Sequence, residues 1–597
     1  MLRLTKLTIR NFRSIRDENF VLPSLTVLVG KNDAGKSNIL EAIDILLEGS
    51  KDSVTTSDFY DFGAAIEIEA LFDGAARYLE LVDEQNRTKM KERLDEAGGL
   101  RLRRIAKPGA GLSKIEIWDP KKKEFGTPTG IDAAIKAMLP EPIYFESLAD
   151  VGDELKGTQK DALGRLVGQV VSVVETKIEP SLKAAYAEAD RQLNVQWNER
   201  DGTERDERVP ELQGIEKEVT AYLKETFPGL SLRLQVKLPG IKQILGSVDV
   251  MVREGGHVDP YYRRGQGLQR SLYLSLLRAL AARTRGEGEK IRKPFILLFE
   301  EAEAFLHPEG QGKMRLALEA ISAQAQVVFT THSPLMVAPS AIAQVVRVEK
   351  RQEDGCPKAV TKRFGPVQLA GVSEKELAAV FALQRSSEFL FARGVLLVEG
   401  EGDEHIFGGI CASLGKPALE ELEIVVVEVR GKDQIRFFRE VLGPLGLRVW
   451  AMTDLDFLWA GAGKVLGADA ELAALCEKLD RESQVEFEKR HVGQEMTEEA
   501  EKRARKEIKK ELCCGSLVKE RDAICAKLQA ENVYVLRQGE IEEYISLGRR
   551  SKGEYMKAAR QLRSGERQVL HKAEFAELWA ALDGRPSEQG ANVPLSI

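Results

Sequence analysis

The spacing of apolar residues predicts a series of strands and one helix at the start of the chain. Residues 2–12 (LRLTKLTIRNF) alternate apolar and polar positions with the two-residue period of a strand, and residues 24–30 (SLTVLVG) form a second β-rich run that ends at Gly30. Residues 37–47 carry apolar side chains at helical spacing, and strand and turn patterns continue over 64–147. The pattern predicts a mixed α/β domain over residues 1–150.

The middle of the chain changes character. Residues 151–228 are polar, with apolar positions every three or four residues, which predicts a helical insertion. Strand patterns then return, followed by a helix at 268–283 and two buried strands at 294–300 and 326–333. We therefore predict that residues 229–380 complete the domain that the insertion interrupts.

The last third of the chain has the pattern of a small parallel α/β domain. Short apolar strands at 395–400, 424–429 and 448–456 alternate with segments of helical periodicity, which predicts such a domain over residues 390–597. Within it, residues 467–530 are very charged and helical. We interpret this stretch, called the charged insert below, as a solvated helical insert.

Composition bounds the class of protein without defining its function. The chain has 597 residues, 43% hydrophobic and 30% charged, as expected for a soluble protein of several domains. Its 87 basic and 94 acidic side chains give a net charge of −7, which argues mildly against nucleic-acid binding, although an average can hide local patches. No apolar run approaches the roughly 20 residues of a membrane span, and the start lacks the apolar core of a signal peptide. The six cysteines have no C-x-x-C spacing, so we expect a cytoplasmic protein without a zinc site.

A complete phosphate-binding loop follows the second predicted strand. Residues 30–37 (GKNDAGKS) match G-x-x-x-x-G-K-S between a strand and a helix. In such a loop, backbone N–H groups curl around phosphate, the lysine neutralises the β- and γ-phosphates, and the serine ligates Mg²⁺. A chance glycine-rich turn is the alternative, and the intact strand–loop–helix context disfavours it. We predict that ATP is bound by Gly30, Asn32, Gly35, Lys36 and Ser37.

Two acids and a histidine complete the predicted ATP site from far downstream. The apolar strand 295–299 ends in Glu300 and Glu301, and residues 296–308 (ILLFEEAEAFLHP) resemble the Walker B and D-loop text of ABC-type ATPases. We predict that Glu300 holds Mg²⁺ through a water molecule and that Glu301 polarises the attacking water. His332, after the next strand, resembles the switch histidine that contacts the γ-phosphate. The alternative for Glu300 and Glu301 is that they merely end a strand. The alternative for His332 is an ordinary surface or core histidine.

A third element implies a second protomer. Residues 264–270 (RGQGLQR) resemble the ABC signature in the form G-x-G-x-Q-R, with Gln266 where serine is usual. In ABC ATPases this segment reaches across to the partner's ATP, so the resemblance implies that Gly265 and Gly267 bind ATP in a dimer. The opening Asn11-Phe12-Arg13 also resembles the start of RecF- and SMC-type heads, with a short insertion in place of a long coiled coil.

Acids follow the strands of the C-terminal domain. Glu399 ends one strand, and Asp454 and Asp456 end a later one. Alternate residues of an extended segment point the same way, so both aspartates can converge, and neighbouring parallel strands bring Glu399 to the same edge. Such crowding favours divalent cations, Mg²⁺ or Mn²⁺, and two of them can drive phosphodiester cleavage. An ordinary strand end is the alternative for Glu399. The order of these acids, with Gly431-Lys432-Asp433, resembles a Toprim domain.

The whole chain resembles the OLD (overcoming lysogenization defect) family, which joins an ABC-type ATPase head to a Toprim nuclease and includes the large subunit of the Gabija anti-phage system. The resemblance implies that Glu399 and Asp403 form the family's E-G-x-x-D motif, and that Glu540 or Glu542 adds a carboxylate from a G-D-L-E-like element. A family lysine that stabilises the transition state best fits Lys572. We predict direct catalytic roles for Glu301, Asp454 and Lys572; the rivals for the lysine are Lys552 and Lys557.

The resemblance also implies partners. It implies double-stranded DNA as the substrate and a homodimer or larger homo-oligomer, with the 151–228 insertion in dimerisation. A UvrD-like helicase partner separates Gabija-like members from stand-alone members, and the sequence leaves both open. Basic segments at Arg101-Leu102-Arg103-Arg104 and Arg263-Arg264 are available to bind the DNA backbone.

We interpret the protein as an ATP-regulated, metal-dependent DNA endonuclease in phage defence or DNA repair. The alternative is a RecF- or SMC-like repair ATPase that clamps DNA and carries a structural, non-catalytic Toprim domain. A third interpretation is a non-catalytic scaffold.

Overall fold

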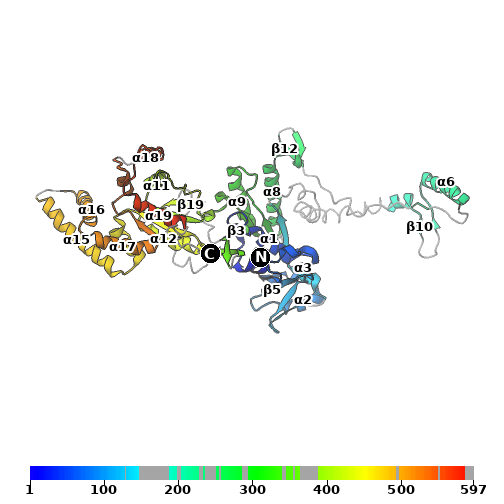
Figure 1. Ribbon diagram of the computed structural model, residues 1–597. Helices are drawn as coiled ribbons and strands as arrows, with labels where there is room; N and C mark the ends of the chain where they lie inside the picture. The colour runs from blue at the N-terminus through cyan, green and yellow to red at the C-terminus, as the bar shows by residue number, and fades with distance from the viewer. Residues whose placement is uncertain are drawn as a thin grey trace, which may run out of the picture.

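Figure 1 shows the computed structural model of the chain, in which the two α/β parts lie next to each other. The description below covers residues 1–127, 130–146, 187–197, 204–226, 233–234, 251–254, 257–284, 293–338, 344–353, 356–363, 388–429, 431–492, 496–548 and 551–584. Most of the predicted 151–228 insertion lies outside these residues; α6 (Pro210–Thr226) is the longest described element in it.

The head is built on a six-stranded sheet whose strands come from both sides of the insertion. The order is β17-β16-β3-β15-β14-β9, and every neighbouring pair is parallel except β16 with β17. Because helices or a second sheet cover both faces, the central strands are continuous apolar runs. The strands are β3 (Leu25–Val29), β9 (Glu141–Phe145), β14 (Phe295–Phe299), β15 (Gln326–Thr331), β16 (Val345–Glu353) and β17 (Cys356–Arg363).

Different layers cover the two faces of this sheet. One face packs with α1 (Lys36–Glu48) and a second, antiparallel sheet, and its core includes Leu28 and Ile296. The other face packs with α8 (Gln266–Thr284) and α9 (Pro308–Ser322). The antiparallel sheet has the order β2-β1-β4-β5-β7-β8, with β6 beside β5. Its strands are β1 (Arg3–Phe12), β2 (Ile15–Val21), β4 (Ile66–Asp73), β5 (Leu100–Lys107), β6 (Gly111–Leu112), β7 (Glu116–Asp119) and β8 (Glu124–Gly126).

The C-terminal domain has a four-stranded parallel sheet in the order β19-β18-β20-β21. The strands are β18 (Gly394–Val398), β19 (Ile424–Glu428), β20 (Arg448–Thr453) and β21 (Val533–Val535). One face packs with α11 (Glu401–Ser413), α18 (Lys552–Ser564) and α19 (Lys572–Asp583). The other packs with α12 (Gln434–Leu442), α13 (Phe457–Ala460), α14 (Ala462–Leu466) and the charged insert. This is the small parallel α/β domain that the sequence predicts.

The charged insert forms three helices between β20 and β21. They are α15 (Ala470–Arg490), α16 (Glu498–Cys514) and α17 (Val518–Ala530). Figure 1 shows α15 and α16 at the end of the C-terminal domain away from the head. Each of the three helices has a buried side, although α16 buries only Ile508 and Cys513. The insert therefore packs on the domain through one side rather than standing free in solvent.

The two parts share one apolar core and a polar junction. Phe389 and Leu390 are buried in a cluster that contains strands of both sheets. Arg347 of β16 is 5% exposed, and its guanidinium donates to the carbonyl oxygens of Leu390, Ala392 and Leu445 at 3.3, 2.8 and 3.2 Å. These contacts attach the six-stranded sheet of the head to the C-terminal domain.

The remaining described helices and strands are short. They are α2 (Glu84–Lys91), α3 (Asp132–Met138), β10 (Gln196–Trp197), β11 (Glu204–Arg205), β12 (Met251–Glu254) and β13 (His257–Pro260). None of the described helices combines the length and apolar character needed to cross a bilayer.

Candidate ATP site and candidate metal centre

The phosphate-binding loop depends on two glycines. Gly30 has φ +147°, and a Cβ there would lie 2.1 Å from the carbonyl oxygen of Val348 in β16. Gly35 has φ +100°, and its Cβ would lie 2.6 Å from Oγ of Ser14. Both positions combine a left-handed backbone with no room for a side chain, so only glycine fits. Helix α1 begins directly after Gly35, which places Lys36 and Ser37 in its first turn.

Lys36 lies inside this loop. It is 6% exposed, and its Nζ donates to the carbonyl oxygens of Gly30 and Lys31 at 3.0 and 2.8 Å. Burial lowers the pKa of Lys36 to about 8, although Glu301, Glu303 and Glu300 oppose the shift. The ammonium is thus enclosed by the backbone that a triphosphate would face.

The ends of β14 and β15 bring the predicted acids and histidine to the same loop. β15 lies between β3 and β14 in the parallel sheet, so the carboxyl ends of all three strands meet. Tyr144 OH donates to Glu300 Oε1 at 2.8 Å, and the N–H of Glu301, at φ +42°, donates to Thr330 Oγ1 at 2.8 Å. His332 Nε2 lies 4.0 Å from Glu301 Oε1.

Glu303 is a residue of this site that the sequence prediction missed. Its Oε1 accepts the backbone N–H of His332 at 2.5 Å and so fixes the end of β15. Burial, followed by the charge of Lys36, lowers the pKa of His332, which favours the neutral imidazole. The only sequence signal for Glu303 was its place in the ILLFEEAEAFLHP segment.

The signature segment begins α8. The carbonyl oxygen of Gly265 accepts the N–H groups of Leu268 and Gln269 at 3.0 and 3.2 Å. Gln269 is buried, and its side chain donates to the carbonyl oxygen of Arg264 at 2.7 Å. A Cβ on Gly267 would lie 3.6 Å from the carbonyl oxygen of Phe305, so the signature packs beside the segment after Glu301. Contact of Gly265 and Gly267 with a partner's ATP stays a prediction.

Three carboxylates meet at the carboxyl edge of the second parallel sheet. Glu399 follows β18 and Asp454 follows the neighbouring β20. One oxygen of each, together with one of Asp456, lies within 4.8 Å of the others. The N–H of Asp454 donates to Glu399 Oε1 at 3.1 Å. We call these three residues the carboxylate cluster.

The aspartates converge by a route that differs from the sequence prediction. Asp456 is not in an extended segment, because its φ of −70° and ψ of −8° are helical and it caps α13. The N–H of Phe457 donates to the carbonyl oxygen of Asp454 at 3.1 Å, which closes a turn directly after β20. This turn, rather than strand alternation, returns Asp456 to the side of Asp454.

The other predicted ligands lie around the cluster. The N–H of Leu455 donates to the carbonyl oxygen of Gly539 at 3.1 Å, which holds the G-E-I-E loop against the D-x-D turn. Asp403, in the first turn of α11, accepts the N–H of Gly400 at 2.9 Å. Glu542 is buried and accepts Tyr555 OH at 3.0 Å.

The protonation of these acids supports a divalent cation site. Burial, then Glu399 and Asp403, raises the pKa of Asp454 to about 9. Burial raises the pKa of Glu399 to about 7 against the opposing charge of Lys432. Burial also raises the pKa of Asp403 to about 7, and Glu542 adds to that shift. Half-buried carboxylates this close are costly unless cations neutralise them, so their oxygens fit Mg²⁺ or Mn²⁺.

Two lysines reach the cluster, and the sequence did not identify either as a site residue. Lys432 Nζ forms an ion pair with Asp456 and lies 3.8 Å from Glu399 Oε2. Lys506 Nζ lies 2.9 Å from Asp456 Oδ2 and 3.0 Å from Glu540 Oε1. Lys432 had a weak signal in its Toprim-like Gly-Lys-Asp loop. Lys506 had none, because it lies in the charged insert among many similar residues.

The lysines proposed from the family resemblance lie elsewhere. Lys572 is the exposed first residue of α19, Lys552 forms an ion pair with Glu401, and Lys557 is exposed on α18. Among the residues that the structure describes, none of the three forms an ion pair with the carboxylate cluster. The role of Lys572 stays a prediction.

The basic segments that we expected to bind DNA are partly used within the head. Arg104 is 6% exposed and donates to the carbonyl oxygen of Gly49. Arg101 pairs with Glu69 at 2.6 Å, and Arg103 pairs with Glu116 at 2.8 Å. The expectation for Arg104 is wrong, because β5 turns its side chain into the protein.

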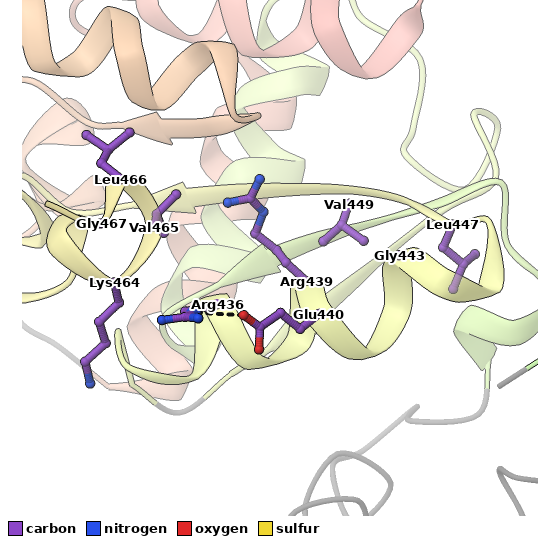
Figure 2. Close-up of a pocket in the computed structure, with 10 residues that line it drawn as sticks. All are labelled: Arg436, Arg439, Glu440, Gly443, Leu447, Val449, Lys464, Val465, Leu466 and Gly467. Carbon is purple, nitrogen blue, oxygen red and sulfur yellow. Dashed lines mark hydrogen bonds and ion pairs between the residues drawn. The ribbon is translucent and has the colours of Figure 1, made fainter. Parts of the chain in front are cut away.

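A pocket with several basic side chains lies between α12 and α14 of the C-terminal domain. It has a volume of about 530 Å³ and is lined by α12, α14 and the start of β20. Figure 2 shows Arg436 and Glu440 of α12 reaching toward each other, with their ion pair at 2.7 Å. Arg439 and Lys464 also line it. Lys464 Nζ pairs with Asp433 at 2.6 Å, and Asp433 follows Lys432 in the chain.

Comparisons with known families match both parts of the chain. The family described as AAA ATPase domain matches residues 2–124 and 116–337, more than half of the chain. The family described as "Overcoming lysogenization defect protein-like, TOPRIM domain" matches residues 390–456, which include Glu399, Asp403, Asp454 and Asp456.

Three curated relatives are similar over most of the chain. Old nuclease of Escherichia phage P2 is 28% identical, over 76% of this chain and 78% of the relative. OLD nuclease of Thermus scotoductus (strain ATCC 700910 / SA-01) is 26% identical, over 67% and 72%. Endonuclease GajA of Bacillus cereus (strain VD045) is 22% identical, over 76% and 75%.

Fold, sites and comparisons define the class of the protein: an ATPase head of the AAA type is followed in one chain by a TOPRIM domain with an acidic cluster. The head and the TOPRIM domain predicted from the sequence are confirmed. The chain belongs to the OLD family.

Proposed function

We propose that this protein is an ATP-regulated, metal-dependent endonuclease that cleaves or nicks double-stranded DNA. The observation that carries the proposal is the carboxylate cluster, whose three ligand oxygens lie within 4.8 Å of one another at the carboxyl edge of the TOPRIM sheet. Relatives over three quarters of the chain are named nucleases, which supports the same activity. The convergence of these three half-buried carboxylates disfavours the alternative of a clamping ATPase with a structural TOPRIM domain.

The acids of the TOPRIM domain would hold divalent cations, Mg²⁺ or Mn²⁺. We propose that two such ions bind. The ligands are Glu399, Asp403, Asp454 and Asp456, with Glu540 or Glu542. When bound, such ions supply an activated water and stabilise the leaving oxygen. The chain itself positions the acids: the turn after β20 brings Asp456 beside Asp454, and the Leu455–Gly539 hydrogen bond adds the Glu540 loop.

The head would regulate this site through ATP. Lys36 and Ser37 would bind the phosphates and Mg²⁺, Glu300 would assist the metal, Glu301 would orient the attacking water, and His332 would sense the γ-phosphate. Nothing in the described head resembles a DNA-cutting site, so a gate or clamp is the role that fits it. An ion pair between Lys31 of the phosphate-binding loop and Glu423 of the TOPRIM domain supports this coupling.

The proposal includes assembly. The signature glycines, Gly265 and Gly267, imply a homodimer or larger homo-oligomer in which each protomer completes the other's ATP site. For DNA, the TOPRIM domain carries basic side chains in the pocket that contains Arg436, Arg439 and Lys464, each of which pairs with an acid in this structure. The Gabija-like branch of the family adds a UvrD-like helicase as a partner, which co-purification from the native host tests.

Nicking of supercoiled plasmid tests the proposal. The full-length protein with Mg²⁺ or Mn²⁺ should convert plasmid to nicked or linear forms, and ATP should change the rate. Asp454→Ala should lower the rate by at least about a hundredfold, because it removes a central carboxylate. Glu471→Ala, which alters an exposed acid of α15, is the matched control and should cut normally. Absence of cleavage with either ion, or full activity of Asp454→Ala, would contradict the proposal.

A further inference from the structure

Helix α16 of the charged insert is attached to the nuclease site by two lysines. Lys506 and Lys510 are four residues apart, so they lie on the same face of the helix. Lys506 pairs with Glu540 at 3.0 Å, and Lys510 pairs with Glu543. Lys509, also on α16, pairs with Asp480 of α15 at 2.5 Å and so joins two helices of the insert. The insert therefore forms one wall of the site.

The two docking lysines differ in what else they touch. Lys510 reaches acids that do not belong to the carboxylate cluster, namely Glu543 and Glu507. Lys506 also contacts Asp456, a member of the cluster, at 2.9 Å. If docking of the helix were its only role, Lys506 would not need a partner at the centre of the metal site.

Lys506 is also more accessible than the other lysine at the cluster. Its side chain is 42% exposed, compared with 19% for Lys432. A lysine has a flexible four-carbon stem and three donors, so an exposed ammonium can exchange partners by rotation of its own side chain. Lys432, enclosed between Glu399 and Asp456, has less room to do so.

We propose that Lys506 is a phosphate-binding residue of the nuclease site, carried by the insert, which contacts the DNA backbone when divalent cations occupy the carboxylates. This inference rests on the proposed nuclease function. Cations bound to Asp456 and Glu540 repel the ammonium from its present partners, while a DNA phosphate brings a new anion to the same place. Lys506 thus changes from a partner of the acids to a partner of the substrate.

Equilibrium DNA binding tests this role without requiring catalysis. Anisotropy of a labelled duplex is measured with the full-length protein in Ca²⁺ and in EDTA, at several salt concentrations, with gels to check that the duplex stays intact. In Ca²⁺, Lys506→Gln should weaken binding by about fivefold and reduce the slope of log K against log salt by about 0.9, the value for one lost phosphate contact. In EDTA its effect should be less than about twofold.

Matched variants separate this role from docking of the helix. Lys510→Gln removes the neighbouring ion pair and should bind DNA like wild type in both conditions. Lys506→Arg keeps the charge and should restore most of the affinity. Equal losses for Lys506→Gln and Lys510→Gln, or the same loss in Ca²⁺ and in EDTA, would overturn the proposal, because both results indicate a structural role.

A metal-binding readout completes the test. The Mn²⁺ concentration that gives half of the thermal shift should be unchanged or lower in Lys506→Gln, since a competing cation is removed. A severalfold increase would assign Lys506 to positioning of the metal ligands instead and would refute the proposal. Plasmid nicking by wild type remains the separate test of the proposed function: wild-type nicking with normal DNA binding by Lys506→Gln contradicts only this inference.

Discussion

Lys31, the second residue of the phosphate-binding loop, forms an ion pair with Glu423, which directly precedes β19 of the TOPRIM domain. A second pair joins Asp33 of the same loop to Lys350 of β16 at 2.6 Å. β16 also carries Arg347, which binds carbonyl oxygens of the TOPRIM domain. A change in the loop on nucleotide binding therefore has a direct physical route to the TOPRIM domain.

We predict that Glu423→Lys alters the effect of ATP on plasmid nicking but hardly changes stability. Both partners are about half exposed, so the pair contributes no more than about 1 kcal/mol to folding. The ratio of nicking rates with and without ATP should shift at least about twofold. The charge swap Lys31→Glu with Glu423→Lys should restore the ratio. An unchanged ratio in Glu423→Lys would show that the pair does not carry the coupling.

Lys36→Ala should abolish ATP hydrolysis, with a loss of at least about a hundredfold in turnover, because Lys36 is the buried cation that we propose faces the phosphates. Phosphate release at saturating ATP measures it. Lys51→Ala, an exposed lysine just after α1, is the control and should hydrolyse ATP normally. Retained turnover in Lys36→Ala would place the ATPase elsewhere.

Divalent cations should bind more tightly as pH rises from about 6 to 9. The pKa values of about 7 for Glu399 and Asp403 and about 9 for Asp454 mean that protons occupy these acids at low pH and must leave before a cation binds. Titration with Mn²⁺ at four pH values measures the effect. In Asp454→Asn the rise above pH 8 should disappear, and a pH-independent affinity in wild type would refute the assignment.

The same shifts predict the pH dependence of stability without cations. Each acid has a pKa above its unfolded value, so the native state binds more protons than the unfolded state between the two values. The stabilising contribution is present at low pH and is lost as pH rises toward about 7 for Glu399 and Asp403 and about 9 for Asp454. In EDTA, the denaturation midpoint should fall less from pH 6 to 9 in Asp454→Asn than in wild type. An equal fall would contradict the prediction.

Arg347→Met should destabilise the junction by about 3 kcal/mol. It leaves the carbonyl oxygens of Leu390, Ala392 and Leu445 without their donor in a buried place. Urea denaturation measures the loss, and limited proteolysis should show faster cleavage between the two domains. Arg351→Met, at a more exposed side chain of the same strand, is the control and should cost less than about 1 kcal/mol.

The local pattern of the sequence was enough to predict the main helices and strands and the functional residues at their ends. Lys36 and Ser37 follow from a glycine loop between a strand and a helix, and Glu399 and Asp454 follow from apolar runs that end in acids. These are short-range features, because the period of a strand and the chemistry of a turn are written in adjacent residues. Membership of the family came from the order of such motifs along the chain.

Tertiary packing decided which distant residues meet. Lys31 and Glu423 are 392 positions apart, and nothing local to either indicates the other. Within the charged insert, helical periodicity shows that α16 forms but not which of its lysines faces the metal site, so Lys506 was indistinguishable from its neighbours. The sequence by itself thus determined the two domains, the phosphate-binding loop and the acids that we propose as metal ligands. The tertiary structure decided the turn that brings Asp456 beside Asp454, the burial of Arg104 and the docking of Lys506, because each depends on surfaces assembled only when separate segments pack together.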